Sequence, residues 1–162
     1  MARGKAPSTP AVRALRQSGV AFSEHLYSYE AHGGTRVAAR ELGVDEHCVV
    51  KTLVLQDEAG KPLLVLMPGN REVSTKQLAR LLGVKQVSPC EPAVAQRHSG
   101  YQVGGTAPFG TRHPLPVYLE REVLALERVY VNGGSRGFLV GLTPGDLLRV
   151  LQATLVEVGI AG

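Results

Sequence analysis

Two apolar runs separated by a short polar loop constrain the fold of this chain more than any other feature. The first run extends from Val49 to Gln56 and the second from Leu63 to Met67, with the sequence DEAGK following the first run. Short apolar runs joined by a loop that contains glycine are typical of a β-hairpin. We therefore expect two neighbouring antiparallel strands here.

The expected helices have recognisable ends. Serine and threonine cap helix N-termini, proline suits the first helical position, and glycine ends a helix in the left-handed conformation. These signals predict helices that open at Thr9, Ser74 and Thr143, and a short helix over 35–42. A further brief helix is expected between the prolines of SPCEPAVAQRHSG.

The remaining apolar segments predict strands between these helices. They lie at 20–29, 84–87, 117–119, 128–131, 138–142 and 155–158. Hairpins combined with crossover helices favour an α/β fold with a mixed β-sheet surrounded by short helices, in a single domain. We assign residues 9–162 to this domain and residues 1–8, which mix Arg, Lys, Gly, Pro and Ser, to a flexible N-terminal arm.

Composition excludes several classes of protein. No stretch approaches the roughly 18 apolar residues needed to span a bilayer, so no membrane partner is expected. The N-terminal sequence MARGKAPSTP has no apolar run behind it and is not a secretory signal, which predicts a cytoplasmic protein. The net charge of +4 permits contact with phosphates without requiring it.

Familiar catalytic and cofactor motifs are missing or lie in the wrong context. GGSRG at 133–137 matches the GxSxG pattern, but the following FLVGL reads as a strand, whereas a nucleophile elbow needs a helix. A hairpin turn is the better interpretation. The five histidines lack the paired spacing of zinc ligands, and neither GxxxxGK nor a GxGxxG after the first strand occurs. We expect no metal and no cofactor.

Lys51 stands out because it interrupts the apolar run CVVKTLVL. An unpaired ammonium is costly to bury, so the strand must expose this position or give it a partner. One interpretation is a lysine that snorkels from an edge strand. The other is a lysine that points into a cleft and holds an anionic or carbonyl-bearing ligand.

A long segment, GYQVGGTAPFGTRHPLP, has no periodicity and is dense in glycine and proline. Loops of this length in a small domain are usually functional, and glycines let main-chain N–H groups approach a ligand. Such donors stabilise a carbonyl oxygen as it gains charge. A purely structural Ω-type loop is the alternative.

Three segments together resemble a known family. HCVVKTLVL, AVAQRHSGYQVGGTAPFG and VYVNGGSRG occur in this order in YbaK/EbsC-type Cys-tRNA(Pro) deacylases, which are similar to the editing domain of bacterial prolyl-tRNA synthetases. The resemblance runs from about Thr9 to the last helix. It implies the fold of that editing domain and an ester hydrolase that acts on mischarged tRNA.

The resemblance also implies roles for particular residues. Lys51, Thr52 and Tyr27 fall on the family's catalytic positions, with Lys51 holding the aminoacyl-tRNA end. The substrate-binding positions fall on the GxxxP loop and on the GGSRG turn, namely Gly104, Gly105, Thr106, Ala107, Pro108, Gly133 and Gly134. One position departs from the pattern, because Leu139 stands where Cys-specific members have an aspartate.

The implied reaction is hydrolysis of Cys-tRNA(Pro) in trans. Cysteine and proline are similar in volume, and a small apolar pocket separates such near-isosteres only about 10- to 200-fold, so mischarged tRNA(Pro) needs a second site for its removal. The expected partners are mischarged tRNA(Pro) and prolyl-tRNA synthetase. Two alternatives stay open, namely a deacylase for another small amino acid such as alanine and a non-catalytic tRNA- or synthetase-binding module.

Overall fold

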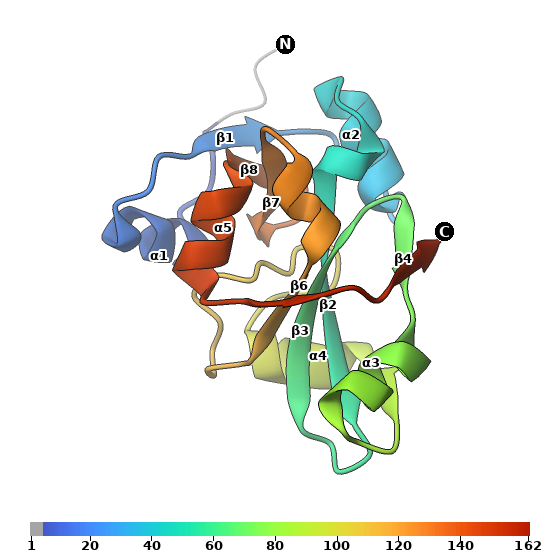
Figure 1. The fold of residues 1–162 in the computed structure, drawn as a ribbon. Coiled ribbons are helices and arrows are strands. Elements are labelled where there is room, and N and C mark those ends of the chain that lie inside the picture. Colours follow the sequence, from blue (N-terminus) through green and yellow to red (C-terminus); the bar gives the residue numbers. More distant parts are fainter. Residues whose placement is uncertain (1–4) are drawn as a thin grey trace.

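Five short α-helices surround one large β-sheet in the computed structural model, which describes residues 5–162 (Figure 1). The helices are α1 (Pro10–Ser18), α2 (Gly34–Leu42), α3 (Thr75–Leu82), α4 (Pro92–Ser99) and α5 (Pro144–Leu151). Two 3-10 helices, η1 (Glu46–Cys48) and η2 (Arg121–Ala125), precede β2 and follow β6. No helix within the described residues is long and apolar enough to cross a membrane.

The large sheet has the strand order β1-β8-β7-β2-β3-β6-β9, and β5 pairs with β2 outside this path. Its strands are β1 (Ser23–Leu26), β2 (Val49–Asp57), β3 (Pro62–Pro68), β5 (Val87–Pro89), β6 (Val117–Glu120), β7 (Val129–Ser135), β8 (Phe138–Leu142) and β9 (Thr154–Val156). A small second sheet pairs β4 (Arg71–Val73) with β10 (Gly159–Ala161).

The predicted hairpin forms the middle of the large sheet. Strands β2 and β3 are antiparallel, with Lys51 opposite Met67 and Leu55 opposite Leu63. Strand β7 is parallel to β2, while β6 is parallel to both β3 and β9. The predicted single-domain α/β fold with a mixed sheet is therefore confirmed.

The predicted capping residues begin their helices. Thr9 Oγ1 accepts a hydrogen bond from Val12 N at 3.1 Å and itself donates to Gly133 O, which ties α1 to β7. Ser74 caps α3, and Thr143 caps α5. These side chains satisfy N–H groups that the first turn of a helix leaves without partners.

Several strands differ from the sequence prediction. The first strand is only Ser23–Leu26 rather than 20–29, so Tyr27 and Tyr29 lie beyond its end. The strand expected at 84–87 lies instead at β5, because Val87 to Pro89 pair with the end of β2. The two short strands of the small sheet were not predicted, since three-residue strands form through tertiary pairing more than through local pattern.

The predicted N-terminal arm lies partly outside the described residues, which begin at Lys5. Residues 5–8 form no helix or strand, and Ala6 packs half-buried against the main core. That core lies between the large sheet and the helices α1 and α5, where Leu15, Phe138 and Leu147 are fully buried. A second cluster fills the space beneath α3 around Leu78.

Candidate active site

A cavity of about 680 Å³ lies where the large sheet is interrupted beside β2. One edge of β2 pairs with β7 at Val49 and Val50 and with β5 from Leu55 to Asp57. Between these pairings, no strand of the described chain pairs with residues 51–53 on this edge. The unpaired stretch lines the cavity, so main-chain groups of β2 face it as well as side chains.

Lys51 lies on this interrupted stretch and lines the cavity. Its side chain is 21 % exposed, and Nζ lies 3.5 Å from Gly69 O and 3.8 Å from Glu72 Oε1. Glu72 is itself largely exposed, so this ion pair is weak and screened by water. The ammonium is therefore held in place by long contacts that an anionic or carbonyl-bearing ligand could replace.

Thr52 and Tyr27 also line the cavity. The Thr52 Oγ1 atom is buried and has no hydrogen-bond partner among residues 5–162. Burial raises the pKa of the Tyr27 phenol above its ordinary value, and neighbouring Tyr29 adds to the rise. Tyr27 is therefore a protonated hydrogen-bond donor at neutral pH, held beside β8 by the bond from its main-chain N to Gly137 O.

The glycine-rich loop also lines the cavity, through Val103, Gly104 and Thr106. Gly104 has φ +90°, and a Cβ there would lie 2.5 Å from Tyr29 Oη, so only glycine fits without a shift. Asn132 Nδ2 donates to Gly104 O at 3.1 Å and Gly105 N donates to Gln102 O. The loop is therefore a tight turn fixed by its own main chain and by a side chain of β7.

Other predicted substrate-binding residues lie behind the cavity wall. Gly105 and Ala107 are buried, and neither lines the cavity. Gly133 and Gly134 do not line it either. A Cβ on Gly133 would meet the Phe138 ring, and a Cβ on Gly134 would lie 2.8 Å from the Tyr101 ring. The structure therefore places these four residues as packing positions, and a direct role in binding stays a prediction.

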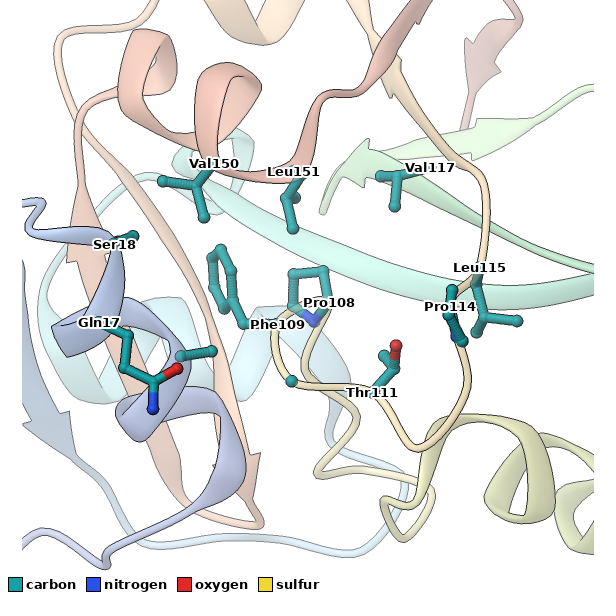
Figure 2. A pocket seen from close by; sticks show the side chains of 12 residues that line it. Gln17, Ser18, Pro108, Phe109, Thr111, Pro114, Leu115, Val117, Val150 and Leu151 are labelled. Atoms are coloured by element: carbon teal, nitrogen blue, oxygen red, sulfur yellow. The ribbon is translucent and has the colours of Figure 1, made fainter.

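Pro108 lines a different cavity of about 480 Å³, between α1, α5 and the second half of the loop. Figure 2 shows Pro108 and Phe109 pointing into this space, toward Val150 and Leu151 of α5. Pro108 therefore anchors the loop from behind, while Gly104 and Thr106 face the cavity beside Lys51.

The cavity has an apolar wall where Cys-specific family members were expected to have a carboxylate. Leu139 of β8 is only 3 % exposed and packs in a cluster with Ala38 and Val49. Leu139, Ala38 and Val49 all line the cavity. A substrate group against this wall meets aliphatic carbon and no charge.

Two residues that sequence reasoning did not single out complete the rim. Arg136, in the β7–β8 turn, and Tyr29, after β1, both line the cavity, and the guanidinium carbon lies 5.2 Å from the centre of the Tyr29 ring. The only sequence signal for Arg136 is its place between the glycines of GGSRG. Within the described chain, no cluster of three His, Cys, Asp or Glu side chains could hold a metal ion.

The sequence model of the aminoacyl-tRNA editing domain matches residues 32–150, a range that includes every cavity residue except Tyr27, Tyr29, Glu30 and Ala31. The chain belongs to the aminoacyl-tRNA editing domain family. This confirms the predicted family, whose substrates are aminoacyl-tRNAs and whose reaction is deacylation.

Relatives of this editing domain include both free-standing proteins and parts of synthetases. The protein named "Putative Cys-tRNA(Pro)/Cys-tRNA(Cys) deacylase EbsC" from Enterococcus faecalis is 29 % identical over 93 % of this chain and 92 % of its own length. A proline–tRNA ligase of Syntrophotalea carbinolica is 37 % identical over 65 % of this chain but only 16 % of its own length. A crystal structure described as "a putative trans-editing enzyme for prolyl tRNA synthetase" superimposes with a TM-score of 0.83 at 26 % identity, covering 96 % of this chain and all of the other.

Proposed function

We propose that this editing domain hydrolyses Cys-tRNA(Pro) in trans, in the cytoplasm. The observation that carries the proposal is the interrupted sheet, which brings Lys51, Thr52 and the loop residues Gly104 and Thr106 to one cavity. The similarity to EbsC and to the trans-editing enzyme supports the choice of substrate. The similarity to proline–tRNA ligases supports tRNA(Pro) as the tRNA and prolyl-tRNA synthetase as a partner.

Lys51 anchors the charged 3′ end of the tRNA in this mechanism. A nucleotide phosphate or the aminoacyl carbonyl oxygen replaces the long contacts of Nζ with Gly69 O and Glu72 Oε1. Holding the ester in one orientation lowers the entropy lost on reaching the transition state. The unpartnered Thr52 hydroxyl and the protonated Tyr27 phenol supply further hydrogen bonds to the aminoacyl group.

The glycine-rich loop stabilises the charge that develops during hydrolysis. Water attacks the aminoacyl carbonyl carbon and gives up a proton, and the carbonyl oxygen becomes negative. The bond from that carbon to the ribose oxygen then breaks, and the ribose oxygen takes up a proton, which leaves a free amino acid and a ribose hydroxyl. The main-chain N–H of Thr106 makes no hydrogen bond to another main-chain group of residues 5–162, and in this mechanism it donates to the negative oxygen. One such donor contributes about 3 kcal/mol to the stability of an oxyanion in known cases.

A second substrate, Ala-tRNA(Pro), is favoured by one observation. The wall formed by Leu139, Ala38 and Val49 offers no polar group to a cysteine thiol and suits a methyl group. A small apolar pocket separates side chains that differ by one group by only about 10- to 200-fold. The preferred amino acid must therefore be measured directly.

The test is deacylation of a panel of tRNAs charged with different amino acids, among them Cys-tRNA(Pro) and Ala-tRNA(Pro). We expect release of cysteine or alanine by the purified chain and no release by Lys51→Ala at unchanged stability. Lys61→Ala, in the exposed loop after β2, is the matched control and should react like the original chain. Normal turnover by Lys51→Ala would remove Lys51 from the mechanism, and binding of charged tRNA without release of any amino acid would indicate a binding module.

A further inference from the structure

The β7–β8 turn holds Arg136 against both the glycine-rich loop and Tyr29. Arg136 Nε donates to Val103 O at 2.9 Å, and its guanidinium lies over the Tyr29 ring. The turn is shaped for this placement, since Gly134 and Gly137 have φ +103° and +78°. Gly105 also needs to be glycine here, because a Cβ would lie 2.9 Å from Arg136 N.

Arg136 is exposed, and no acidic side chain among the described residues forms an ion pair with it. Arg40, Arg71, Arg121 and Arg149, by contrast, each lie within 4.0 Å of a carboxylate. The side-chain hydrogen bond of Arg136 uses Nε, and its terminal nitrogens make no hydrogen bond or ion pair to residues 5–162. Tyr29 below it is 37 % exposed. The pair therefore presents a flat, cationic and aromatic surface at the cavity rim.

Flat cationic and aromatic surfaces recognise nucleobases by stacking. Unpaired bases stack on tyrosine rings and on arginine guanidinium planes, and this stacking is largely independent of sequence. The surface adjoins the cavity that also contains Lys51 and Thr52. A ligand whose small acyl group enters that cavity thus carries its nearest nucleobase to the rim.

We propose that Arg136 and Tyr29 form the subsite for the base of the 3′-terminal nucleotide, at the rim of the aminoacyl cavity. This inference rests on the proposed function, because it requires an aminoacyl-tRNA end as the ligand. Arg136 stacks on the base and keeps Val103 O bonded, so that base binding and the shape of the glycine-rich loop are coupled. Lys51 then contacts the other end of the nucleotide, inside the cavity.

The first test measures binding of the uncharged trinucleotide CCA by calorimetry. We expect Arg136→Ala and Arg136→Lys to weaken binding about tenfold or more, because lysine keeps the charge and loses the plane. Arg80→Ala, an exposed arginine on α3 away from the cavity, is the control and should leave binding unchanged. If Arg136→Lys bound CCA with the affinity of the original chain, the contact would be a simple one to phosphate, and stacking would be overturned. Absence of saturable CCA binding to the original chain would also overturn the proposal.

The second test separates stacking from a purely structural role of Arg136. Tyr29→Phe keeps the ring and should keep CCA affinity, whereas Tyr29→Leu should lose it. Tyr29 is not a partner in the hydrogen bond between Arg136 and Val103 O, so we expect that bond to persist in both variants. In deacylation assays we expect a raised KM with little change in kcat for Tyr29→Leu. A lowered kcat at unchanged KM would overturn the subsite. CCA binding is measured without any deacylation, so the subsite and the proposed function can fail separately.

Discussion

Lys51 illustrates how a charge is accommodated in an otherwise apolar strand. Its neighbours Val49, Val50 and Val54 are buried, yet the Lys51 ammonium reaches the polar groups Gly69 O and Glu72 Oε1 at the edge of the sheet. The interruption between β7 and β5 gives this side chain room that a continuous sheet would deny it. The Lys51 side chain is therefore partly exposed and also has a charged partner, and both features lower the cost of placing a cation in an apolar strand.

Tyr101 fixes the start and the middle of the glycine-rich loop to each other. It is 4 % exposed, and its hydroxyl donates to Phe109 O at 2.6 Å. Tyr101→Phe leaves this carbonyl without its partner, which we expect to lower the free energy of unfolding by about 1–2 kcal/mol. Urea unfolding of the two proteins at pH 7 measures the loss.

The same residue predicts a pH dependence of stability. Burial raises the pKa of Tyr101 to about 12, whereas in the unfolded chain it is about 10. The unfolded chain therefore loses this proton first, and the contribution of Tyr101 to stability declines as the pH rises from 10 to 12. The difference in unfolding free energy between the original chain and Tyr101→Phe should shrink over this range. A difference that stays constant would contradict the burial of the protonated phenol.

At the scale of elements, the glycine-rich loop depends on Gly104. In Gly104→Ala the added Cβ meets Tyr29 Oη at 2.5 Å, and φ +90° is strained for any residue with a side chain. We expect deacylation to fall at least about tenfold, because the loop shifts away from the reacting carbonyl. Stability should fall by about 1 kcal/mol.

Gly60→Ala is the matched control for this loop variant. Gly60 has φ +79° in the β2–β3 turn, and a Cβ there meets nothing within 4 Å. Both substitutions thus introduce a similar backbone strain, but only one lies on the cavity. Equal deacylation by the two variants, compared at equal fractions of folded protein, would show that the loop has no part in the reaction.

Elements with local signals were predictable from sequence, and elements that depend on distant partners were not. Thr9 with Pro10 and Thr143 with Pro144 mark helix starts within a few residues, and the β2–β3 hairpin follows from its apolar runs. Strands β4 and β10 carry no such pattern and exist because segments far apart in sequence meet. The strand expected at 84–87 was misplaced for the same reason.

The residues of the candidate site also fall into two groups, those that the sequence indicated and those that only the structure reveals. Lys51 and Gly104 were recognisable because a charge in an apolar run and a glycine-dense loop are unusual in themselves, and both line the cavity. Tyr29 and Arg136 have ordinary sequence surroundings and become notable only when the β7–β8 turn meets the loop. Gly133 lies in a glycine-rich segment of the kind that binds ligands through its main chain, but the Phe138 ring fills the space where a Cβ of residue 133 would lie.

At the scale of the whole molecule, the C-terminal segment joins the two sheets. Figure 1 shows it running from α5 across the molecule to β4. Strand β9 extends the large sheet beside β6, and β10 then pairs with β4, placing Ile160 opposite Glu72. Glu72 is the carboxylate 3.8 Å from Lys51 Nζ. The last residues of the chain thus support a neighbour of the candidate active site.

Glu120 holds this segment in place at the point where it leaves the large sheet. The side chain is 6 % exposed, and its two carboxylate oxygens accept hydrogen bonds from Val158 N at 2.8 Å and Gly159 N at 3.0 Å. Glu120→Gln replaces one acceptor with an NH₂ group that faces a donor. We expect the free energy of unfolding to fall by about 1–3 kcal/mol, because bonds to a charged acceptor are stronger than neutral ones.

Amide hydrogen exchange locates the effect of this substitution. In Glu120→Gln the amides of residues 158–161 should exchange faster than in the original chain, while those in the centre of β3 change only with global stability. Glu157→Gln is the control, because Glu157 is exposed and its ion pair with Arg121 at 3.6 Å is worth at most about 1 kcal/mol. Unchanged exchange at 158–161 in Glu120→Gln would mean that pairing with β4 alone holds the segment, and that the buried carboxylate is not what joins the two sheets.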